Sequence, residues 1–304
     1  MTAAERKPEL STSRQRLLAR VDRILACPHC RVPLSRAEPQ RAFLCPECGE
    51  TFDARTEQYS FWNIPRTDVE QDWLNRAKES AKRGLKWFYP TACRMISPVL
   101  GGVDTKPFLA TFDTETQLVA DLGSGTNEYR ESVVCVDGVG YPNVHVVANL
   151  ECLPFQNDSL AGIVSCAVLE HARHPAAHVA EMRRVLQPGG RVLCFIPFIQ
   201  GFHASPHDYQ RYTKEGLREL FAEFEVLNVA VGAGPTSGLL WILQEWLALA
   251  LSFGSVRLYR LLVPCTWVLS PLKFLDVLLS RHPAATVIAS GHFIEARKAI
   301  AVGK

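Results

Sequence analysis

The sequence predicts an α/β fold: a doubly wound, mostly parallel sheet, with a small cysteine-rich module before it and an apolar helical insert toward the C-terminus. Three observations support this prediction. Short apolar runs alternate with helical patterns from residue 117 onward, four of the ten cysteines form two close pairs, and residues 238–280 are almost wholly apolar. With 304 residues, 47% of them hydrophobic, the chain is long enough for one large domain and one small module.

Six apolar runs are expected to form the strands of the large domain: residues 118–120, 133–136, 144–148, 163–166, 192–196 and 226–231. Nearly continuous apolar strands separated by helices are typical of the parallel sheets of Rossmann-like folds. One helix is expected to begin at Pro175 and to stop at the Pro-Gly-Gly of 188–190, and Thr213 is expected to cap another. Residues 292–298 are expected to return as a last strand at the sheet edge.

The chain divides by composition into six segments. We expect a flexible or partly helical tail over 1–20, the cysteine module over 21–66, and bridging helices over 67–115. We expect the α/β core over 116–235, the insert over 236–285, and the last strand and tail over 286–304. The N-terminal residues have no apolar run of the secretory kind, and the six other cysteines are scattered, as reduced thiols are. These features predict a cytoplasmic protein.

The two cysteine pairs have the spacing of a metal site. Cys27 and Cys30 form one CxxC pair, Cys45 and Cys48 form the other, and fourteen residues separate them. Two such turns supply four sulfurs in a tetrahedron, which suits Zn²⁺ and leaves no open coordination position. The sequence therefore predicts one structural Zn²⁺ in a zinc ribbon. A pair of redox CxxC motifs is the less favoured alternative.

The turn after the first predicted strand has the features of a cofactor site. The strand ends on Asp121, and the chain then turns through Gly123 and Gly125, which let the backbone approach a ligand closely. A carboxylate at this position would repel a pyrophosphate but suits a cationic amino-acid group. The next strand ends on Asp137, whose carboxylate can accept hydrogen bonds from ribose hydroxyls.

The stretch from 118 to 231 resembles the class I S-adenosylmethionine-dependent methyltransferases of the type-11 group. The resemblance rests on Asp-Leu-Gly-Ser-Gly at 121–125, Asn-Leu-Glu-Cys-Leu-Pro-Phe at 149–155, Ser-Cys-Ala-Val-Leu-Glu-His at 165–171 and Glu-Met-Arg-Arg-Val-Leu-Gln-Pro-Gly-Gly at 181–190. It implies S-adenosyl-L-methionine as cofactor and methyl transfer as activity. Its implied cofactor-binding residues are Asp121, Gly123, Gly125, Asp137, Asn149, Leu150 and Ser165.

The sequence departs from the family pattern at three points. Asn127 stands where a third glycine is common, Asn149 stands where an aspartate is usual, and residues 127–132 leave too little room for a normal first helix. A catalytically inactive binding or regulatory module with the same fold is therefore one alternative function.

The loop after the fifth predicted strand carries the candidate catalytic residues. His203, His207 and Asp208 lie close together there, at the end of the sheet where ligands bind in open α/β folds. A histidine beside a carboxylate can act as a general base near neutral pH. For His207, we weigh the role of general base equally against a role in bracing the helix that follows. Glu170 and His171 are weaker candidates for the general base.

The apolar insert bears on the methyl acceptor. Residues 238–280 carry few charges, and they fit either a helix in the headgroup layer of a membrane or a buried cover or dimer interface. We expect a small-molecule or lipid/glycan-type acceptor. If the insert lies in the headgroup layer, we also expect peripheral membrane association. The alternative is an rRNA or tRNA base methyltransferase whose ribbon reads RNA; the basic N-terminal segment favours it, and the net charge of only +2 disfavours it.

Overall fold

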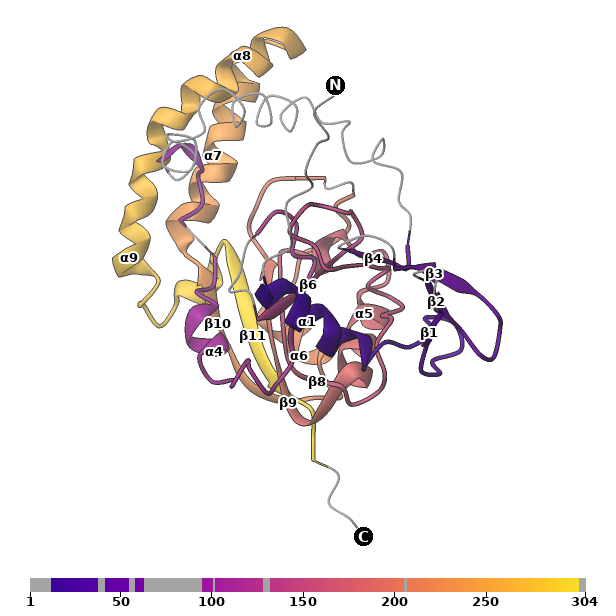
Figure 1. Ribbon diagram of the computed structural model, residues 1–304. Coiled ribbons are helices and arrows are strands. Elements are labelled where there is room, and N and C mark those ends of the chain that lie inside the picture. Colours follow the sequence, from indigo (N-terminus) through magenta and orange to yellow (C-terminus); the bar gives the residue numbers. More distant parts are fainter. Residues whose placement is uncertain are drawn as a thin grey trace, which may run out of the picture.

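The computed structural model describes residues 12–37, 42–54, 58–62, 95–100, 102–127, 132–204 and 207–300. In this part of the chain, one sheet runs through the molecule in the order β1-β2-β3-β4-β7-β6-β5-β8-β9-β11-β10 (Figure 1). Its strands are β1 (Ser35–Ala37), β2 (Ala42–Leu44), β3 (Thr51–Asp53), β4 (Tyr59–Ser60), β5 (Val119–Leu122), β6 (Val133–Asp137), β7 (Val146–Val147), β8 (Leu160–Cys166), β9 (Leu186–Pro197), β10 (Glu225–Ala233) and β11 (Gly291–Arg297).

Strands β7, β6, β5, β8 and β9 pair in parallel and form the centre of the sheet. Most of their residues are buried, because helices or loops cover both faces; the exceptions lie at strand ends and in the first half of β9. The six predicted strands are thus confirmed, and the fifth extends through the Pro-Gly-Gly that was expected to precede it. Helix α5 (Pro175–Val185) begins at the predicted proline, and Thr213 caps α6 (Lys214–Leu220) by accepting a hydrogen bond from the Gly216 N–H.

The last strand does not lie where the sequence placed it. β11 inserts between β9 and β10, antiparallel to both, so β10 forms the edge. Ile294 of β11 faces Cys194 on one side and Val229 on the other, and its side chain is fully buried. A strand with buried residues is more stable with a neighbour on each side, because both sets of its backbone groups are then paired.

The segment expected to be a flexible or partly helical tail is helical in its described part. Residues Thr12–Asp22 form α1, and Leu17, Leu18 and Val21 are buried in the main core. Arg14 donates to the Val144 carbonyl at 2.9 Å, which fixes α1 beside the loop between β6 and β7. The described residues of the β5–β6 and β6–β7 connections contain no helix, and α1 covers the sheet in this region (Figure 1).

The predicted bridging helices lie mostly outside the described residues. Within 95–115, α4 (Lys106–Leu109) places Phe108 against Val164 and Leu193, on the face of the sheet opposite the main core. The cysteine module is an antiparallel β1–β2–β3 unit, and its β4 pairs in parallel with β7. The module therefore extends the main sheet.

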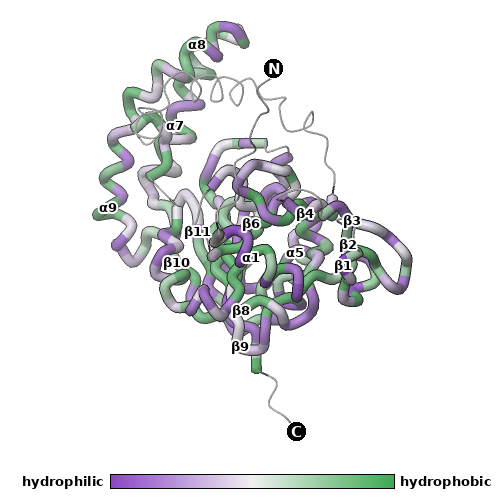
Figure 2. Tube along the Cα trace, viewed as in Figure 1, coloured by the Kyte–Doolittle hydropathy of each residue, from purple (hydrophilic) through white to green (hydrophobic). Residues whose placement is uncertain are grey.

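The insert forms a long helical hairpin, residues 235–279, which we call the arm. Helix α7 (Pro235–Leu251) leads away from the sheet, and α8 (Val256–Thr266), η3 (Trp267–Leu275) and α9 (Asp276–Leu279) lead back; hydrophobic residues predominate along it (Figures 1 and 2). Buried Asp276 ties the two halves together at the base by accepting hydrogen bonds from the Thr236 and Ser237 N–H groups at 2.7 and 2.8 Å. Among the described residues, the stretch Val256–Leu279 is long and apolar enough to cross a membrane, by length and composition only.

Candidate functional site

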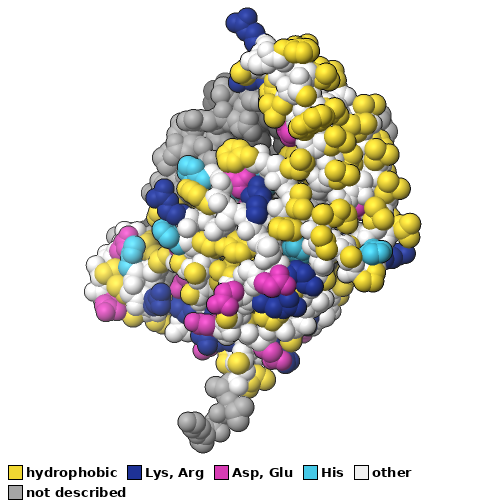
Figure 3. Space-filling view, turned by 180° about the vertical axis from the view of Figure 1, so that it is seen from behind, with side chains coloured by type: hydrophobic (Ala, Val, Ile, Leu, Met, Phe, Trp, Pro, Cys, Tyr) yellow, Lys and Arg dark blue, Asp and Glu magenta, His cyan; other side chains and the backbone are white. Residues whose placement is uncertain are grey.

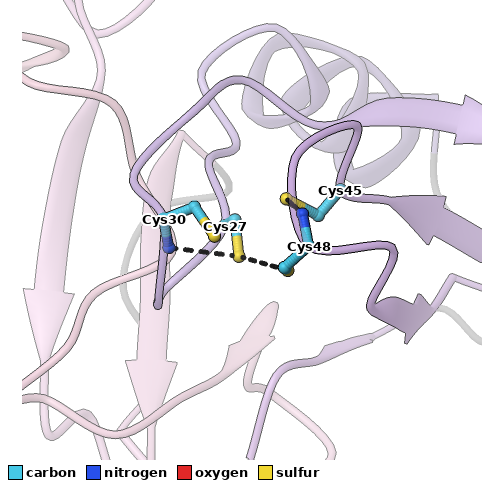
Figure 4. Close-up of side chains that lie close together, drawn as sticks. All are labelled: Cys27, Cys30, Cys45 and Cys48. Atoms are coloured by element: carbon cyan, nitrogen blue, oxygen red, sulfur yellow. Dashed lines mark hydrogen bonds between the residues drawn. The ribbon is translucent and has the colours of Figure 1, made fainter.

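The four predicted metal ligands meet in one cluster. Their side chains point toward one another from two loops (Figure 4), and every Sγ atom lies within 4.8 Å of the other three. The Sγ atoms of Cys27 and Cys48 are 3.9 Å apart. The 3.9 Å separation is close to the ~3.8 Å expected between two thiolates of one tetrahedral ion, whose metal–sulfur bonds are about 2.3 Å long.

The two loops of the cluster have the same local structure. In each, the N–H of the second cysteine points at the sulfur of the first at 3.5 Å. In each, the next residue, Arg31 or Gly49, has a left-handed backbone with φ of 62° or 74° and closes the turn by donating to the first cysteine's carbonyl. This repeated turn aims both sulfurs of a pair at one point, which a redox dithiol does not require.

The cysteine module is joined to the loop that follows β7. The Ala26 N–H donates to the Pro154 carbonyl at 3.0 Å, and the Gln156 N–H donates to the Ile24 carbonyl at 2.8 Å. Buried Glu181 of α5 adds a polar link, because it accepts hydrogen bonds from Arg31 of the module and from the Leu153 N–H. The position of this loop thus depends on the fold of the module.

The glycine turn after β5 has the backbone that the sequence predicted. Gly123 and Gly125 have φ of +78° and +53°, values that favour glycine. Asp137 accepts hydrogen bonds from the Gly125 and Val139 N–H groups, both at 2.8 Å. Burial raises the pKa of the Asp137 carboxyl, although these two N–H groups act in the opposite direction.

Asn143, which the sequence analysis missed, braces the same turn. Its side-chain amide donates to the carbonyls of Gly125 and Asn127 at 3.0 and 2.8 Å. These bonds hold the turn in a connection that has little room for a first helix. No local motif marks Asn143, because it follows the next strand and reaches the turn only in the folded sheet.

A pocket of about 450 Å³ lies over this turn. Five of the predicted cofactor residues line it: Gly123, Gly125, Asp137, Asn149 and Leu150. The sequence analysis did not assign the lining residues Trp62, Tyr141, Arg173 and His178 to the pocket. Trp62 comes from the end of the cysteine module, and a tryptophan at that place in the chain carries no local signal for a distant pocket.

Two predicted cofactor residues lie beneath the pocket. Asp121 and Ser165 are almost fully buried and are not among its lining residues. The Ser165 hydroxyl donates to the Leu122 carbonyl at 3.0 Å, which joins β8 to the end of β5. The contribution of Ser165 is therefore to fix the strand end that carries the glycine turn.

The pocket fits the cofactor that the family resemblance implies. Its volume is typical of small-molecule sites. No atom lies within 4 Å of the position that a Cβ on Gly125 would take, so a ligand can approach this backbone closely. Burial lowers the pKa of His178 to about 4, so this wall of the pocket is neutral at physiological pH, and Asp137 supplies the carboxylate expected to hold a ribose.

The candidate catalytic residues divide into two groups. His207 lines the pocket, and its ring centroid is 5.4 Å from that of Tyr209. His203 lies deeper, with Nε2 3.7 Å from a Glu170 oxygen and Nδ1 3.7 Å from an Asp208 oxygen. Burial alone would lower the pKa of His203, but Glu170, the Gly201 carbonyl and Asp208 together raise it above its ordinary value.

Asp208 braces the loop. It forms a bidentate ion pair with Arg211, and one of its oxygens also accepts a hydrogen bond from the His203 N–H at 2.8 Å. Burial would raise the pKa of Asp208, but Arg211 and the His203 N–H hold it below its usual value. With its oxygens engaged in this way, the carboxylate fixes the positions of Arg211 and His203.

The arm begins beside this loop. The ring centroids of His203 and Trp241 of α7 are 5.4 Å apart. Gly201 is packed so closely that an added Cβ would lie 2.4 Å from the Trp241 Nε1. Trp241 therefore connects the loop that carries the candidate catalytic residues to the arm.

Comparisons with known proteins agree with this site. The sequence profile of a methyltransferase domain family, the type-11 group, matches residues 121–194, which include the glycine turn and Asp137. No curated protein sequence matches the chain significantly.

Two solved structures are among those similar to this chain. The phosphoethanolamine N-methyltransferase 2 of Haemonchus contortus, solved with S-adenosyl-L-methionine, is 15% identical, with a TM-score of 0.41 over 73% of this chain and 60% of that one. The chain thus spans about three fifths of that enzyme. The Burkholderia thailandensis 1,6-didemethyltoxoflavin-N1-methyltransferase is 14% identical, with a TM-score of 0.40 over 84% of this chain and 98% of that one.

Proposed function

Because the chain carries a class I S-adenosylmethionine-dependent methyltransferase domain, we propose that it methylates a lipid-type acceptor that it takes from a membrane surface. The observation that carries this proposal is the position of the arm. Trp241 contacts the catalytic loop at the arm's base, and a long apolar surface leads away from that point.

The pocket residues have distinct roles in this reaction. Gly123 and Gly125 admit the cofactor to the backbone, and Asp137 accepts hydrogen bonds from its ribose hydroxyls. When bound, S-adenosylmethionine supplies a methyl group on a sulfonium, which a nucleophilic atom of the acceptor displaces. His207 lines the pocket and is placed to accept the proton that the acceptor loses.

The surface of the arm supports a membrane as the source of the acceptor. Hydrophobic side chains gather along it (Figure 3), and a monomeric soluble protein rarely exposes so large an apolar patch. Phe253, at the turn between α7 and α8, is 88% exposed. Other residues of the arm that are at least 60% exposed include Trp246, Leu249, Val256, Leu261, Val268 and Leu278.

The charges of the arm favour an anionic bilayer as the occupant of this surface. Lys273 and Asp276 are buried at the base, and the Glu245 carboxylate accepts a hydrogen bond from Tyr259. The exposed charged residues of the arm are Arg257 and Arg260, near its tip. Positive charge beside exposed aromatic and aliphatic side chains suits insertion among anionic headgroups.

The four-cysteine cluster is proposed to hold one structural Zn²⁺. Its four sulfurs would fill a tetrahedral coordination sphere, so the ion would stabilise the module. Through the contacts at Pro154 and Gln156, the module would in turn hold the loop that carries Asn149 and Leu150. Metal analysis of the purified protein should therefore find zinc, and substitution of one cysteine should remove it.

The structure weakens the argument for RNA as acceptor. That alternative relied on the basic N-terminal segment, but Arg14 and Arg20 of this segment donate to the carbonyls of Val144 and Thr114. These side chains hold α1 on the catalytic domain, so they are less available to phosphates.

The acceptor class is tested by transfer of radiolabelled methyl groups from S-adenosylmethionine into a cell extract. The extract is then separated into organic, nucleic-acid, and protein-plus-small-molecule fractions. We expect label in the organic fraction, and less of it when both His203 and His207 are replaced by alanine. Label confined to the RNA would overturn the lipid proposal.

The membrane step is tested by flotation of the full-length protein with anionic phosphatidylserine-containing vesicles. Wild type should float, and Trp246→Asp and Phe253→Asp should each reduce the floating fraction strongly. Leu227→Asp is the matched control, because Leu227 is an exposed leucine on β10, away from the arm. If the two arm variants floated like the control, or if the arm mediated a stable dimer that never floated, the membrane proposal would be wrong.

A further inference from the structure

Glu170, His171 and His203 form a second group of metal-ligating side chains, between the cofactor pocket and the arm. The ligand atoms of all three lie within 4.8 Å of one another. The His171 Nε2 is 3.8 Å from a Glu170 oxygen, and the His203 Nε2 is 3.7 Å from the same carboxylate. His171 lines the pocket, and His203 contacts Trp241 of α7.

The Glu170 carboxylate has an unusual environment. Glu170 is fully buried, and neither of its carboxylate oxygens has a hydrogen-bond donor among the described residues. A buried carboxylate costs several kcal/mol unless a positive group or several donors compensate it. The groups that face it here are the two histidine Nε2 atoms, at distances too long for hydrogen bonds.

The other nitrogen of each histidine ring identifies which atoms are free to bind a cation. The His171 Nδ1 lies 2.5 Å from the His207 carbonyl oxygen, and the His203 Nδ1 lies 3.0 Å from the Gly201 carbonyl oxygen. A carbonyl only accepts, so each Nδ1 that donates to one carries the proton. At His203 the Gly201 carbonyl is the nearer partner, and the Arg211 guanidinium lies 3.3 Å from the same nitrogen. In the neutral rings, both Nε2 lone pairs are then directed at the Glu170 carboxylate.

The distances suit a shared ion. Two ligand atoms about 2.1 Å from one metal are separated by about 3.4 Å at a tetrahedral angle, and by about 4.2 Å when they lie opposite each other. The observed 3.7 and 3.8 Å fall within this range. Histidines that bind metals usually donate their other ring N–H to a carbonyl or carboxylate, as both do here.

We propose that Glu170, His171 and His203 bind a divalent first-row transition-metal ion, separate from the four-cysteine site. Two imidazoles and one carboxylate form a three-ligand set that leaves coordination positions open, as in catalytic zinc and non-haem iron sites. Arg211 contacts His203 on its Nδ1 side, opposite the nitrogen that faces Glu170.

The position of the ion defines its use. It lies between the pocket that holds the methyl donor and the base of the arm, where the acceptor is expected to arrive. There it would act as a Lewis acid and lower the pKa of an acceptor hydroxyl, whose proton would pass to His207 or water as the oxygen takes the methyl group. This use rests on the proposed function, whereas binding of the ion does not.

The experiment titrates the full-length, zinc-loaded protein with Mn²⁺ and follows free Mn²⁺ by electron paramagnetic resonance. Co²⁺ absorption serves as a second probe, because an N/O site lacks the thiolate charge-transfer band of a cysteine site. We expect one additional ion per chain, and at least about a tenfold loss of affinity in Glu170→Gln and in His203→Gln. The zinc content of the cysteine cluster should stay unchanged in both variants, which also reports that they are folded.

His174→Gln is the matched control. His174 forms a similar histidine–glutamate contact, 3.5 Å from Glu151, but its side chain is 65% exposed, so its loss should leave Mn²⁺ affinity unchanged. If neither Mn²⁺ nor Co²⁺ bound wild type more tightly than Glu170→Gln, the metal site would be refuted, whatever the flotation experiment showed. If the ion bound as expected but label went to RNA, the site would stand and the lipid acceptor would fall.

Discussion

Replacing Glu181 by alanine should destabilise the protein by about 3 kcal/mol. Glu181 is 5% exposed, and its carboxylate accepts two hydrogen bonds from Arg184, at 2.8 and 2.7 Å, besides those from Arg31 and the Leu153 N–H. Removal of one partner from a buried ion pair typically costs about 3–5 kcal/mol, because the remaining charge is left uncompensated.

The lower end of that range applies because Arg184 has other acceptors. Its guanidinium also donates to the Phe155 and Leu153 carbonyls, at 2.7 and 2.9 Å, and these bonds survive the substitution. Because Glu181 links the cysteine module to the loop beside the pocket, the variant should also bind S-adenosylmethionine more weakly.

Urea denaturation of the zinc-loaded protein, followed by circular dichroism, measures the free energy of unfolding. Glu223→Ala is the control. Glu223 pairs at 3.4 Å with Arg183 of α5, the helix that also carries Glu181, but both side chains of this pair are exposed. Its loss should therefore cost about 0–1 kcal/mol. If the two variants lost equal stability, the view that Glu181 locks the module to the core would be wrong.

Three further predictions concern the pocket, the pH dependence and the metal cluster. Gly125→Ala should fold, at a cost of about 1–2 kcal/mol for its left-handed backbone. Calorimetry should show that this variant binds S-adenosylmethionine more weakly. Gly123→Ala should lose more stability, because its Cβ would lie 2.3 Å from Val168 Cγ2. Burial lowers the pKa of His145 from 6.5 to about 4, so the neutral ring stabilises the fold above pH 6.5 and this stability is lost as pH falls toward 4. Between pH 7 and pH 5, His145 should lower the free energy of unfolding by about 2 kcal/mol. Urea titrations of His145→Asn at the two pH values should not show this loss. Cys45→Ser should abolish zinc in metal analysis and lower the thermal midpoint, whereas unchanged zinc would contradict the four-sulfur site.

The catalytic domain was largely predictable because its signals are local. Apolar runs between turn residues indicate strands, and each strand found begins or ends within a few residues of its predicted bounds, except that the fifth begins six residues earlier. The paired cysteines and the glycine turn are similarly local, since the turn itself brings neighbouring residues together. Asp137 was identified by its place at a strand end, a position that parallel topology brings beside the turn.

The residues that sequence reasoning misplaced are those whose positions depend on distant packing. β11 entered the sheet between β9 and β10, because strand order is decided by which neighbours bury its two sides. The sequence left open whether the tail is flexible or partly helical. It forms α1, because the loops between the first strands leave a sheet face to cover and Leu17, Leu18 and Val21 can cover it.

The sequence by itself determined the class of the domain, its cofactor turn and the four-cysteine cluster, since residues close in the chain form each of them. Only the tertiary structure decided what surrounds the proposed acceptor site. Glu170 follows β8, His203 lies in the loop after β9, and Trp241 lies on α7. These three residues are far apart in the sequence, yet the loop after β9 brings them to one place. No short motif encodes that meeting, because it follows from strand order and from the packing of the arm against the sheet.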